Sequence, residues 1–593
     1  MYRPLKLRMR RLFKRRKKVA IEAADQAEQH FERLFFKRLN RLANVRRFVV
    51  GWMTLLILLV VSVGLQARGL GVYYQKIGPV EGGTFREGII GTFTNANPLY
   101  ASTNVDGTVA KLLFSSLFAY DSKNKLVSDL ADRWEADENG QVYKIFLRKN
   151  ILWHDKKPFT ADDVVFTYQT IQKPDAKSPL GTSWRGVAVQ KLDDFTVEFT
   201  LPSPLASFPY SLTNGIVPKH ILEGIPASQL RSVPFNTVNP IGTGPFIWGS
   251  VEVTGLDKNS RSEQVALKRN ESYHLGAPKI DQYVVKAFRS EDKLIQAYER
   301  QEISAIVGLN SVPDSFKDAS STIVHSTPMD GNVMLFMNNS SEFLADTKVR
   351  RGLVHATDVK NLLSQLSFSA ISTNSPLLKE QIGYDASLTQ LSFDSELAKK
   401  TLEESGWLLQ ADGTRKKGEQ TLTLRLVSQN VAEYAAVAKQ VQKQWKDIGV
   451  QVEVGLRSEE DMQGDVLSRH NYDVLLYGIT LGIDPDVFAY WHSSQADIRS
   501  PSRLNLSEFK SKEADKSLEA GRTRIDAKLR AVKYRPFLVA WREEAPAIAL
   551  YQPRFLYITR SQVVGYSMNR LNSAVDRLNS IQNWTVLQDK TVK

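Results

Sequence analysis

The chain has 593 residues, about four times the length of a ~150-residue domain, so two or more lobes are expected. Apolar residues make up 42% and charged residues 24%, which excludes collagen-like and predominantly disordered classes. The chain has no cysteine, which excludes disulfides, thiolate metal sites, cysteine nucleophiles and a lipid-modified N-terminal cysteine.

The net charge of +14 is concentrated at the N-terminus. Residues 1–47 hold 16 Lys or Arg and four acidic residues, so this tail carries +12 and the other 546 residues only +2. The basic run is densest at 10–18, and a following stretch can place Phe31, Leu34, Phe35 and Leu42 on one helix face. We expect the tail to lie on anionic membrane lipid. Nucleic-acid binding is not expected, because basic residues beside a span ordinarily set topology.

Residues 48–67, FVVGWMTLLILLVVSVGLQA, carry no formal charge. As a helix they are about 30 Å long, the hydrocarbon thickness of a bilayer, so one transmembrane helix is predicted. A cleaved signal peptide is the alternative, since Ser62 and Gly64 offer small residues at a suitable spacing, but its basic and apolar regions would be too long. The charge asymmetry places the N-terminus in the cytoplasm and the C-terminal region outside the cell or in the periplasm. Residues 68–81 are predicted to be a linker.

The rest of the chain has a mixed α/β pattern. Residues 83–93 and 143–148 alternate as strands, and residues 105–118 have helical spacing. Thr160 and Asp163 have the spacing of a capping box at the start of a helix. A helix is also predicted over 394–407, stopped by Gly406.

Residues 421–454 predict a βαβ unit. Two alternating segments, 421–427 and 450–454, flank a helix-period segment, 431–448, that stops at Gly449. A further strand is predicted at 472–478. Mixed sheets covered by helices follow from this order of elements.

Motifs for covalent chemistry are missing from the sequence. The eight histidines form no pair at i, i+3 or i+4, and there is no GxSxG or Walker motif. The GTG at 242–244 is followed by Pro245 rather than by a helix that could hold a phosphate, and the SxxK at 122–125 lies in a polar, turn-like stretch. We therefore expect no enzyme activity, cofactor or metal.

Two sets of residues are candidates for a ligand site. Asp484 and Asp486 directly follow the strand at 472–478, where the carboxyl end of an α/β sheet often meets ligand; a structural turn and a metal site are the alternatives. Four aromatic residues near turns are candidates for cleft walls, with core packing as the alternative for each: Trp184, Trp407, Tyr477 and Trp491.

Several separated blocks resemble one family in the same order. The longest is LVSDLADRWEADENGQVYKIFLRKNILWHDKKPFTADDVVFTYQ, residues 126–169. Later blocks are IGTGPF, ESYHLGAPKID, YDVLLYGITLGIDPDVFAYWHSSQ and EEAPAIALYQP. From about residue 82 to 570 the chain resembles the family 5 extracellular solute-binding proteins, the peptide- and nickel-type receptors of ABC transporters.

The resemblance implies an α/β fold with two hinged lobes, periplasmic-binding-protein-like (type II, cluster C), with an extra subdomain. Lobe I would comprise 82–304, with the subdomain at about 121–235, and 541–593; lobe II would comprise 305–540. The lobes would close on a ligand, and the transporter's permease subunits would recognise the closed form.

One departure from the family bears on the ligand. The resemblance implies a Trp and then an Asp for the peptide's ammonium in the loop after the strand at 472–478, but Leu481 occurs here. Either Asp484 accepts from the ammonium or the ligand's N-terminus is not read. The LGIDPD form is similar to that of members that accept longer peptides.

The sequence therefore predicts a membrane-tethered receptor of an ABC importer that binds oligopeptides. Asn338 and Asn339, after the apparent strand NVMLFM, are further ligand-binding candidates. Two alternatives stay open: a sensor or scaffold whose tail docks inside the cell, and a receptor for a non-peptide solute such as a nickel complex or a sugar.

Overall fold

The computed structural model describes residues 5–31, 46–255, 262–317, 319–368, 370–497, 499–500 and 503–592. The chain divides into two compact units, residues 1–78 with 588–593, and residues 79–587. The first unit holds helices α1 (Leu5–Phe31) and α3 (Arg46–Tyr74), and most of the paired strands β1 (Gln75–Val80) and β23 (Leu587–Val592).

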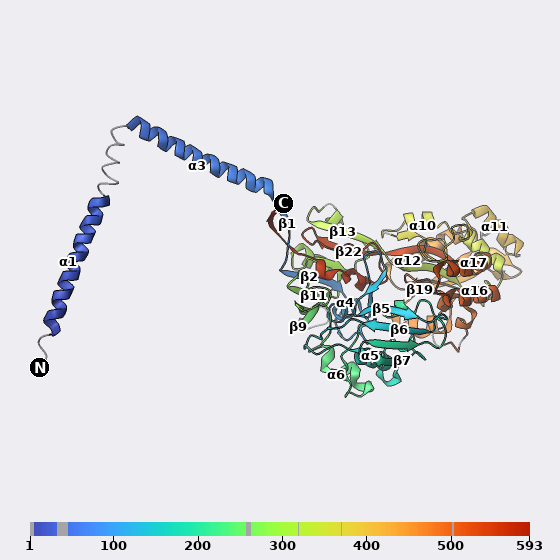
Figure 1. Ribbon diagram of the computed structural model, residues 1–593. Coiled ribbons are helices and arrows are strands. Elements are labelled where there is room, and N and C mark those ends of the chain that lie inside the picture. The colour runs from blue at the N-terminus through green and yellow to red at the C-terminus, as the bar shows by residue number, and fades with distance from the viewer. Residues whose placement is uncertain are drawn as a thin grey trace. The chain divides into compact units, whose positions relative to one another are not determined.

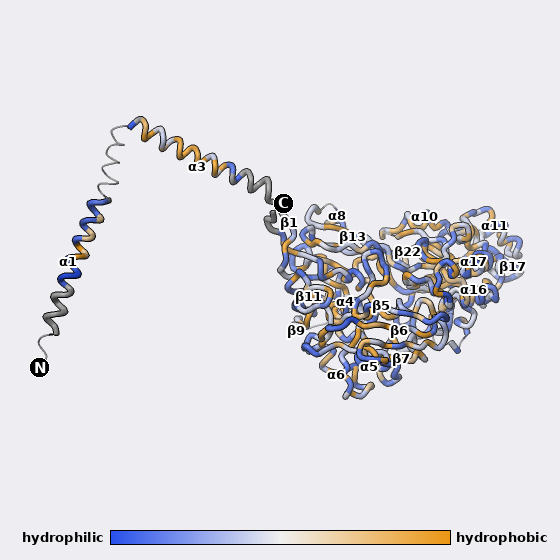
Figure 2. Tube along the Cα trace, in the orientation of Figure 1, coloured by the Kyte–Doolittle hydropathy of each residue, from blue (hydrophilic) through white to orange (hydrophobic). Residues whose placement is uncertain are grey.

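Helix α3 contains one segment, Phe48–Gln66, that is long and apolar enough to cross a membrane and is not buried (Figure 2). The helix continues through residues 68–74 and strand β1 follows, so most of the predicted linker, 68–81, is helix and strand. No proline precedes Pro79 in this stretch to stop the helix. Helix α1 covers the basic run at 10–18, whereas most of the predicted apolar face from Phe31 to Leu42 lies outside the described residues.

A twelve-stranded mixed sheet runs through the second unit. Ten strands form its path in the order β20 (Gln451–Arg457), β19 (Thr423–Gln429), β21 (Val474–Thr480), β14 (Gly331–Met337), β22 (Ala547–Arg560), β12 (Ala305–Val307), β2 (Thr84–Ile90), β11 (Gln282–Phe288), β10 (Ser262–Arg269) and β9 (Phe246–Thr254). Two more strands pair with β22: β13 (Thr322–Pro328) and β15 (Ala370–Ser372).

Strand β22 belongs to both halves of this sheet (Figure 1). Its first part pairs with β14 and β15 as far as Pro553, and its second part pairs with β13 and β12 from Arg554 onwards. The chain therefore passes between the two lobes at 329–330, between β13 and β14, and inside β22. The predicted lobe boundaries at 305 and 541 lie earlier along the chain than these crossings, since β12 and β13 pair with the second part of β22 and the first part of β22 pairs with β14.

Lobe I is built from both ends of the second unit. Arg577 donates to both carboxylate oxygens of Glu87 on β2, at 2.9 and 2.5 Å, and both side chains are fully buried. Trp584 packs edge-on against Phe85 in the same core. Residues almost five hundred positions apart thus complete this lobe.

A four-stranded antiparallel sheet lies within lobe I, in the order β5 (Ala131–Ala136), β6 (Val142–Leu147), β8 (Thr196–Thr200) and β7 (Ala188–Asp193). Helix α5 (Ala161–Gln172) contacts its β7 and β8 strands, and its predicted capping box between Thr160 and Asp163 is confirmed. Figure 1 shows these elements gathered in one part of the body.

The predicted βαβ unit of lobe II is confirmed. Strands β19 and β20 are parallel and are joined by α12 (Ala432–Lys446), which ends before Gly449 at φ +89°. Helix α11 (Ser395–Glu404) is capped by Asp394 and is followed by Gly406 at φ +90°. Helices α16 (Lys512–Arg522) and α17 (Ala527–Glu544) complete the lobe beside β21 and β22.

The helix predicted at 105–118 is shorter in the structure. Helix α4 (Asn104–Leu113) ends because the chain turns to extended backbone at Phe114. The N–H of Gly244 donates to the Leu113 carbonyl at 2.8 Å, and a Cβ on Gly242 would lie 1.9 Å from that oxygen. The GTG glycines therefore allow a close backbone approach.

Candidate functional site

The loop after β21 is fixed to the point where the chain crosses between the lobes. The backbone N–H groups of Leu481 and Gly482 both donate to the Asp330 carbonyl, at 2.8 and 3.2 Å. The Gln381 side chain donates to the Gly482 carbonyl at 2.6 Å. Leu481 is buried in the lobe II core.

Asp484 forms a two-fold ion pair with Arg530 on α17. Both of its carboxylate oxygens accept from the guanidinium at 2.5 Å, and the two side chains are only 3–4% exposed. Burial disfavours the charge of Arg530, but the Asp484 carboxylate outweighs that effect and raises the pKa of Arg530. Of the two alternatives for a ligand's ammonium, acceptance by Asp484 is disfavoured, because this carboxylate is already paired with Arg530.

Asp486 is paired as well. One oxygen accepts from Arg522 at 2.9 Å, and the other is buried without a partner among the described residues. Burial raises the pKa of this carboxyl. The two aspartates thus attach their loop to α16 and α17.

Contacts between the lobes lie around this loop. The Ala206 N–H in lobe I donates to the Arg522 carbonyl at 2.8 Å. Arg570, in the lobe I segment after β22, pairs with Asp330 and, at 2.7 Å, with Glu380 in lobe II. Asn124 of lobe I also donates to the Asp330 carboxylate. The structure therefore holds the lobes together at the crossing.

The three tryptophan candidates lie in the cores. Trp184 packs against Tyr168 at a ring separation of 4.2 Å, Trp407 against Phe343 at 5.8 Å, and Trp491 against Phe336 at 5.7 Å. None is more than 4% exposed. The prediction that these three tryptophans line a cleft is therefore corrected: they pack in the cores.

Asn338 and Asn339 lie at the opposite end of β21 from Asp484. The Asn338 amide donates to the carbonyls of His470 and Tyr472 at 3.3 and 3.2 Å, and the Asn339 N–H donates to the Ser507 carbonyl. The seven residues of β21 separate the two ends by about 20 Å. The structure does not bring these asparagines together with the aspartates.

Tyr477 lines a half-open pocket of about 620 Å³ in lobe II. Its other walls include Tyr490, Thr480, Gln463, Leu467 and Leu506. The described residues that line it carry no carboxylate.

The edge of β21 beside this pocket has no neighbouring strand. Strand β14 pairs with β21 over its whole length, but β19 pairs with it only as far as Leu476. The Leu481 N–H donates to the carbonyl of Asp330, which directly precedes β14. In an antiparallel pair, main-chain groups of alternate residues point toward the partner strand, so those of Leu481 point toward β14 and those of Gly478 and Thr480 point to the open edge. Tyrosine hydroxyls meet them there.

These two hydroxyls come from different elements. Tyr490 donates to the Thr480 carbonyl at 2.9 Å. Burial raises the pKa of Tyr434 on α12, and the Gly478 N–H opposes that rise by donating to its hydroxyl. Neither Gly478 nor the contacts of the Tyr434 and Tyr490 hydroxyls with the edge of β21 were predicted from the sequence. A glycine inside a strand is nevertheless a signal that another group approaches the backbone closely.

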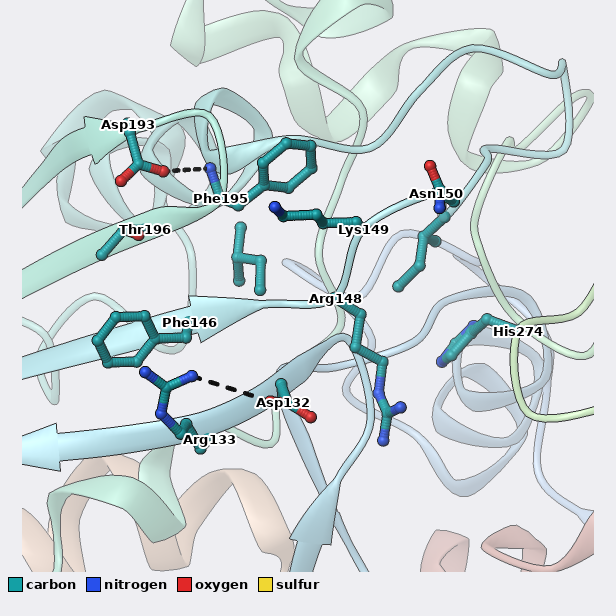
Figure 3. A pocket seen from close by; sticks show the side chains of 12 residues that line it. Asp132, Arg133, Phe146, Arg148, Lys149, Asn150, Asp193, Phe195, Thr196 and His274 are labelled. Carbon is teal, nitrogen blue, oxygen red and sulfur yellow. Dashed lines mark hydrogen bonds and ion pairs between the residues drawn. The ribbon is translucent and has the colours of Figure 1, made fainter.

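A second pocket, of about 890 Å³, lies in lobe I and is lined by several charged residues (Figure 3). Arg133 lies 3.8 Å from the centre of the Phe146 ring and pairs with Asp132 and Glu135, while Lys149 lies over the Phe195 ring. Its walls come from the four-stranded sheet and its loops, with His274, and include none of the sequence candidates. We therefore take the pocket beside β21 as the candidate site.

Comparisons with known proteins agree on one family. The family model for bacterial extracellular solute-binding proteins, family 5, matches residues 125–500. The oligopeptide-binding protein AppA of Bacillus subtilis is 26% identical over 499 residues, covering 82% of this chain and 89% of that protein.

Solved structures give the same result. The structure of Bacillus subtilis AppA with a nonapeptide has a TM-score of 0.68 at 25% identity, covering 86% of this chain and all of that one. The structure of NikZ from Campylobacter jejuni with Ni(L-His) has a TM-score of 0.70 at 26% identity, covering 85% and 99%. The two-lobed fold is thereby confirmed.

Proposed function

Because the chain belongs to the bacterial extracellular solute-binding proteins of family 5, we propose that it is a membrane-tethered receptor that binds oligopeptides for an ABC importer. The family consists of transport receptors, peptide- or nickel-type, that work without enzyme activity. The tether and the peptide ligand are the proposed parts. Closure of the two lobes would trap the ligand and present it to the permease subunits.

The open edge of β21 is the observation that carries the peptide assignment. Gly478 and Thr480 turn main-chain groups to a pocket of about 620 Å³, where the Tyr434 hydroxyl accepts from the Gly478 N–H and the Tyr490 hydroxyl donates to the Thr480 carbonyl. A peptide strand added here would replace those hydroxyls with main-chain hydrogen bonds, a mode that tolerates many side chains. AppA, solved with a nonapeptide, supports the same assignment.

The apolar segment of α3 would hold the receptor in the membrane. Its N-terminal side carries the basic tail, so the positive-inside rule places the tail in the cytoplasm, on anionic lipid, and the lobes on the other side. Protease added to intact cells, with the outer membrane opened where there is one, should digest the lobes and spare the tail. Digestion of the tail instead would exclude this topology.

Gly478 provides the test of the binding edge. A Cβ at this position would lie 2.7 Å from the Tyr434 hydroxyl, whereas a Cβ at Gly224 would meet nothing within 4 Å. The full-length chain is placed in nanodiscs and titrated with a mixed nonapeptide library. The Gly478→Ala variant should bind the library at least about tenfold more weakly than the wild type, and the Gly224→Ala variant should bind it with unchanged affinity. Unchanged binding by the folded Gly478→Ala variant, or wild-type chain that binds only a nickel complex or a sugar, would contradict the proposal.

A further inference from the structure

The pocket beside β21 offers hydrogen bonds without net charge. Its polar walls are hydroxyl and amide groups, including those of Tyr477, Tyr490, Gln463 and Thr480. Its one cationic wall residue among those described, Arg503, pairs with Glu508 at 2.9 Å and donates to the Ser468 carbonyl at 2.7 Å, and its Nε is buried without a described partner.

The nearby aspartates cannot supply the missing charge. Asp484 is bound through both oxygens by Arg530, and Asp486 is paired with Arg522. A carboxylate held by a buried guanidinium in this way has its charge compensated. A ligand ammonium arriving beside β21 would find both oxygens of Asp484 and one oxygen of Asp486 already paired, and the other Asp486 oxygen buried.

Two carboxylates outside the pocket wall bear on it: Glu508, which is paired with Arg503, and Glu459. Glu459, on α13 (Glu459–Asp461), acts on Tyr477 through its charge and adds to the rise in the Tyr477 pKa that burial causes. Its side chain is exposed to solvent, where an ion pair is weak because water and salt screen it. Glu459 is therefore the competitor to be tested.

We infer that the site binds an internal, uncharged stretch of peptide main chain and reads neither the N-terminal ammonium nor the C-terminal carboxylate. A charged end group placed in this pocket would lose its hydration without gaining a partner, which is costly. The end groups must then lie outside the pocket, so the ligands are peptides long enough to extend beyond it on both sides. This inference rests on the proposed peptide function.

The experiment compares the retention of peptides whose end groups are free or blocked. A nonapeptide library is prepared in four forms: free, N-acetylated, C-amidated and modified at both ends. Full-length chain in nanodiscs is incubated with an equimolar mixture of the four, and the retained peptides are counted by mass spectrometry. The four forms should be retained within about threefold of one another.

The outcomes separate this inference from the function on which it rests. Enrichment of the free-amine form by more than tenfold over the N-acetylated form overturns the inference and leaves the peptide function standing. Retention of no peptide in any form overturns both. Glu459→Gln should retain the four forms as the wild type does, and selective loss of the free-amine form in this variant would show that Glu459 reads the ammonium and that the inference is wrong.

Discussion

Asp484 and Arg530 join the loop after β21 to the first turn of α17 by two hydrogen bonds of 2.5 Å, with both side chains buried. Removing one partner would leave an uncompensated charge in a site closed to water, which costs about 3–5 kcal/mol. We expect Arg530→Met to lower the melting temperature of the full-length chain strongly, as measured by thermal unfolding.

Two further variants isolate the pair. The double change Asp484→Leu with Arg530→Met should recover most of the lost stability, since it removes both charges. Arg524→Met, at an exposed position in the same segment, should have almost no effect. If Arg530→Met lowered the melting temperature no more than Arg524→Met does, the ion pair of Asp484 and Arg530 would have no structural role.

Arg570 should matter more than Glu380, although the two form an ion pair. Glu380 is 77% exposed, so Glu380→Ala should change peptide affinity less than about twofold. Arg570→Ala also deprives the buried Asp330 carboxylate of its cation, at the point where the chain crosses between the lobes. We expect it to weaken peptide binding about tenfold, with isothermal titration calorimetry as the measurement. Equal effects of both changes would contradict this ranking.

His154 predicts a pH dependence of stability. Burial lowers its pKa from 6.5 to about 4, and the neutral ring accepts from the Gly242 N–H while its other nitrogen lies 3.1 Å from the Gly244 carbonyl. The unfolded state therefore takes up a proton between pH 6.5 and 4 while the folded state does not, so stability falls as the pH is lowered through that window.

The full effect is about 3 kcal/mol. His154→Gln keeps an acceptor and a donor but cannot be protonated, so the difference in melting temperature between variant and wild type should change across this window. A constant difference from pH 7 to pH 4 would show that His154 does not control this dependence.

Asn338→Ala should leave ligand binding unchanged. The Asn338 amide donates to the carbonyls of His470 and Tyr472, at the end of β21 opposite Gly478 and Thr480. Loss of these buried hydrogen bonds should cost about 1–3 kcal/mol of stability, measured by thermal unfolding. A loss of peptide affinity in folded protein would return Asn338 to the list of ligand-binding candidates.

Local features of the fold could be predicted from the sequence. The βαβ unit around α12 and the capping box at Thr160 depend on periodicity and on residues a few positions apart, so short windows contain their cause. The continuation of α3 to Tyr74 and the strand after it were not predicted, although no proline in residues 68–74 stops the helix.

Non-local features could not be predicted in this way. The lobe boundaries depend on which strands pair with β22, and neither β12 nor β13 carries that information in its own residues. Asp484 was identified, but its partner Arg530 lies 46 positions away with no signal in the spacing. The tryptophans near turns were equally ambiguous, since a turn residue can point into a core or into a cleft.

The buried pair of Glu87 and Arg577 has a consequence for biogenesis. Lobe I needs Arg577 and Trp584, almost five hundred positions after Glu87 and Phe85, before its interior is complete. Almost five hundred residues must therefore be synthesised after Glu87 before this half can finish folding. Chains that terminate early would leave Glu87 stranded in an apolar interior, which makes them ready substrates for quality-control proteases.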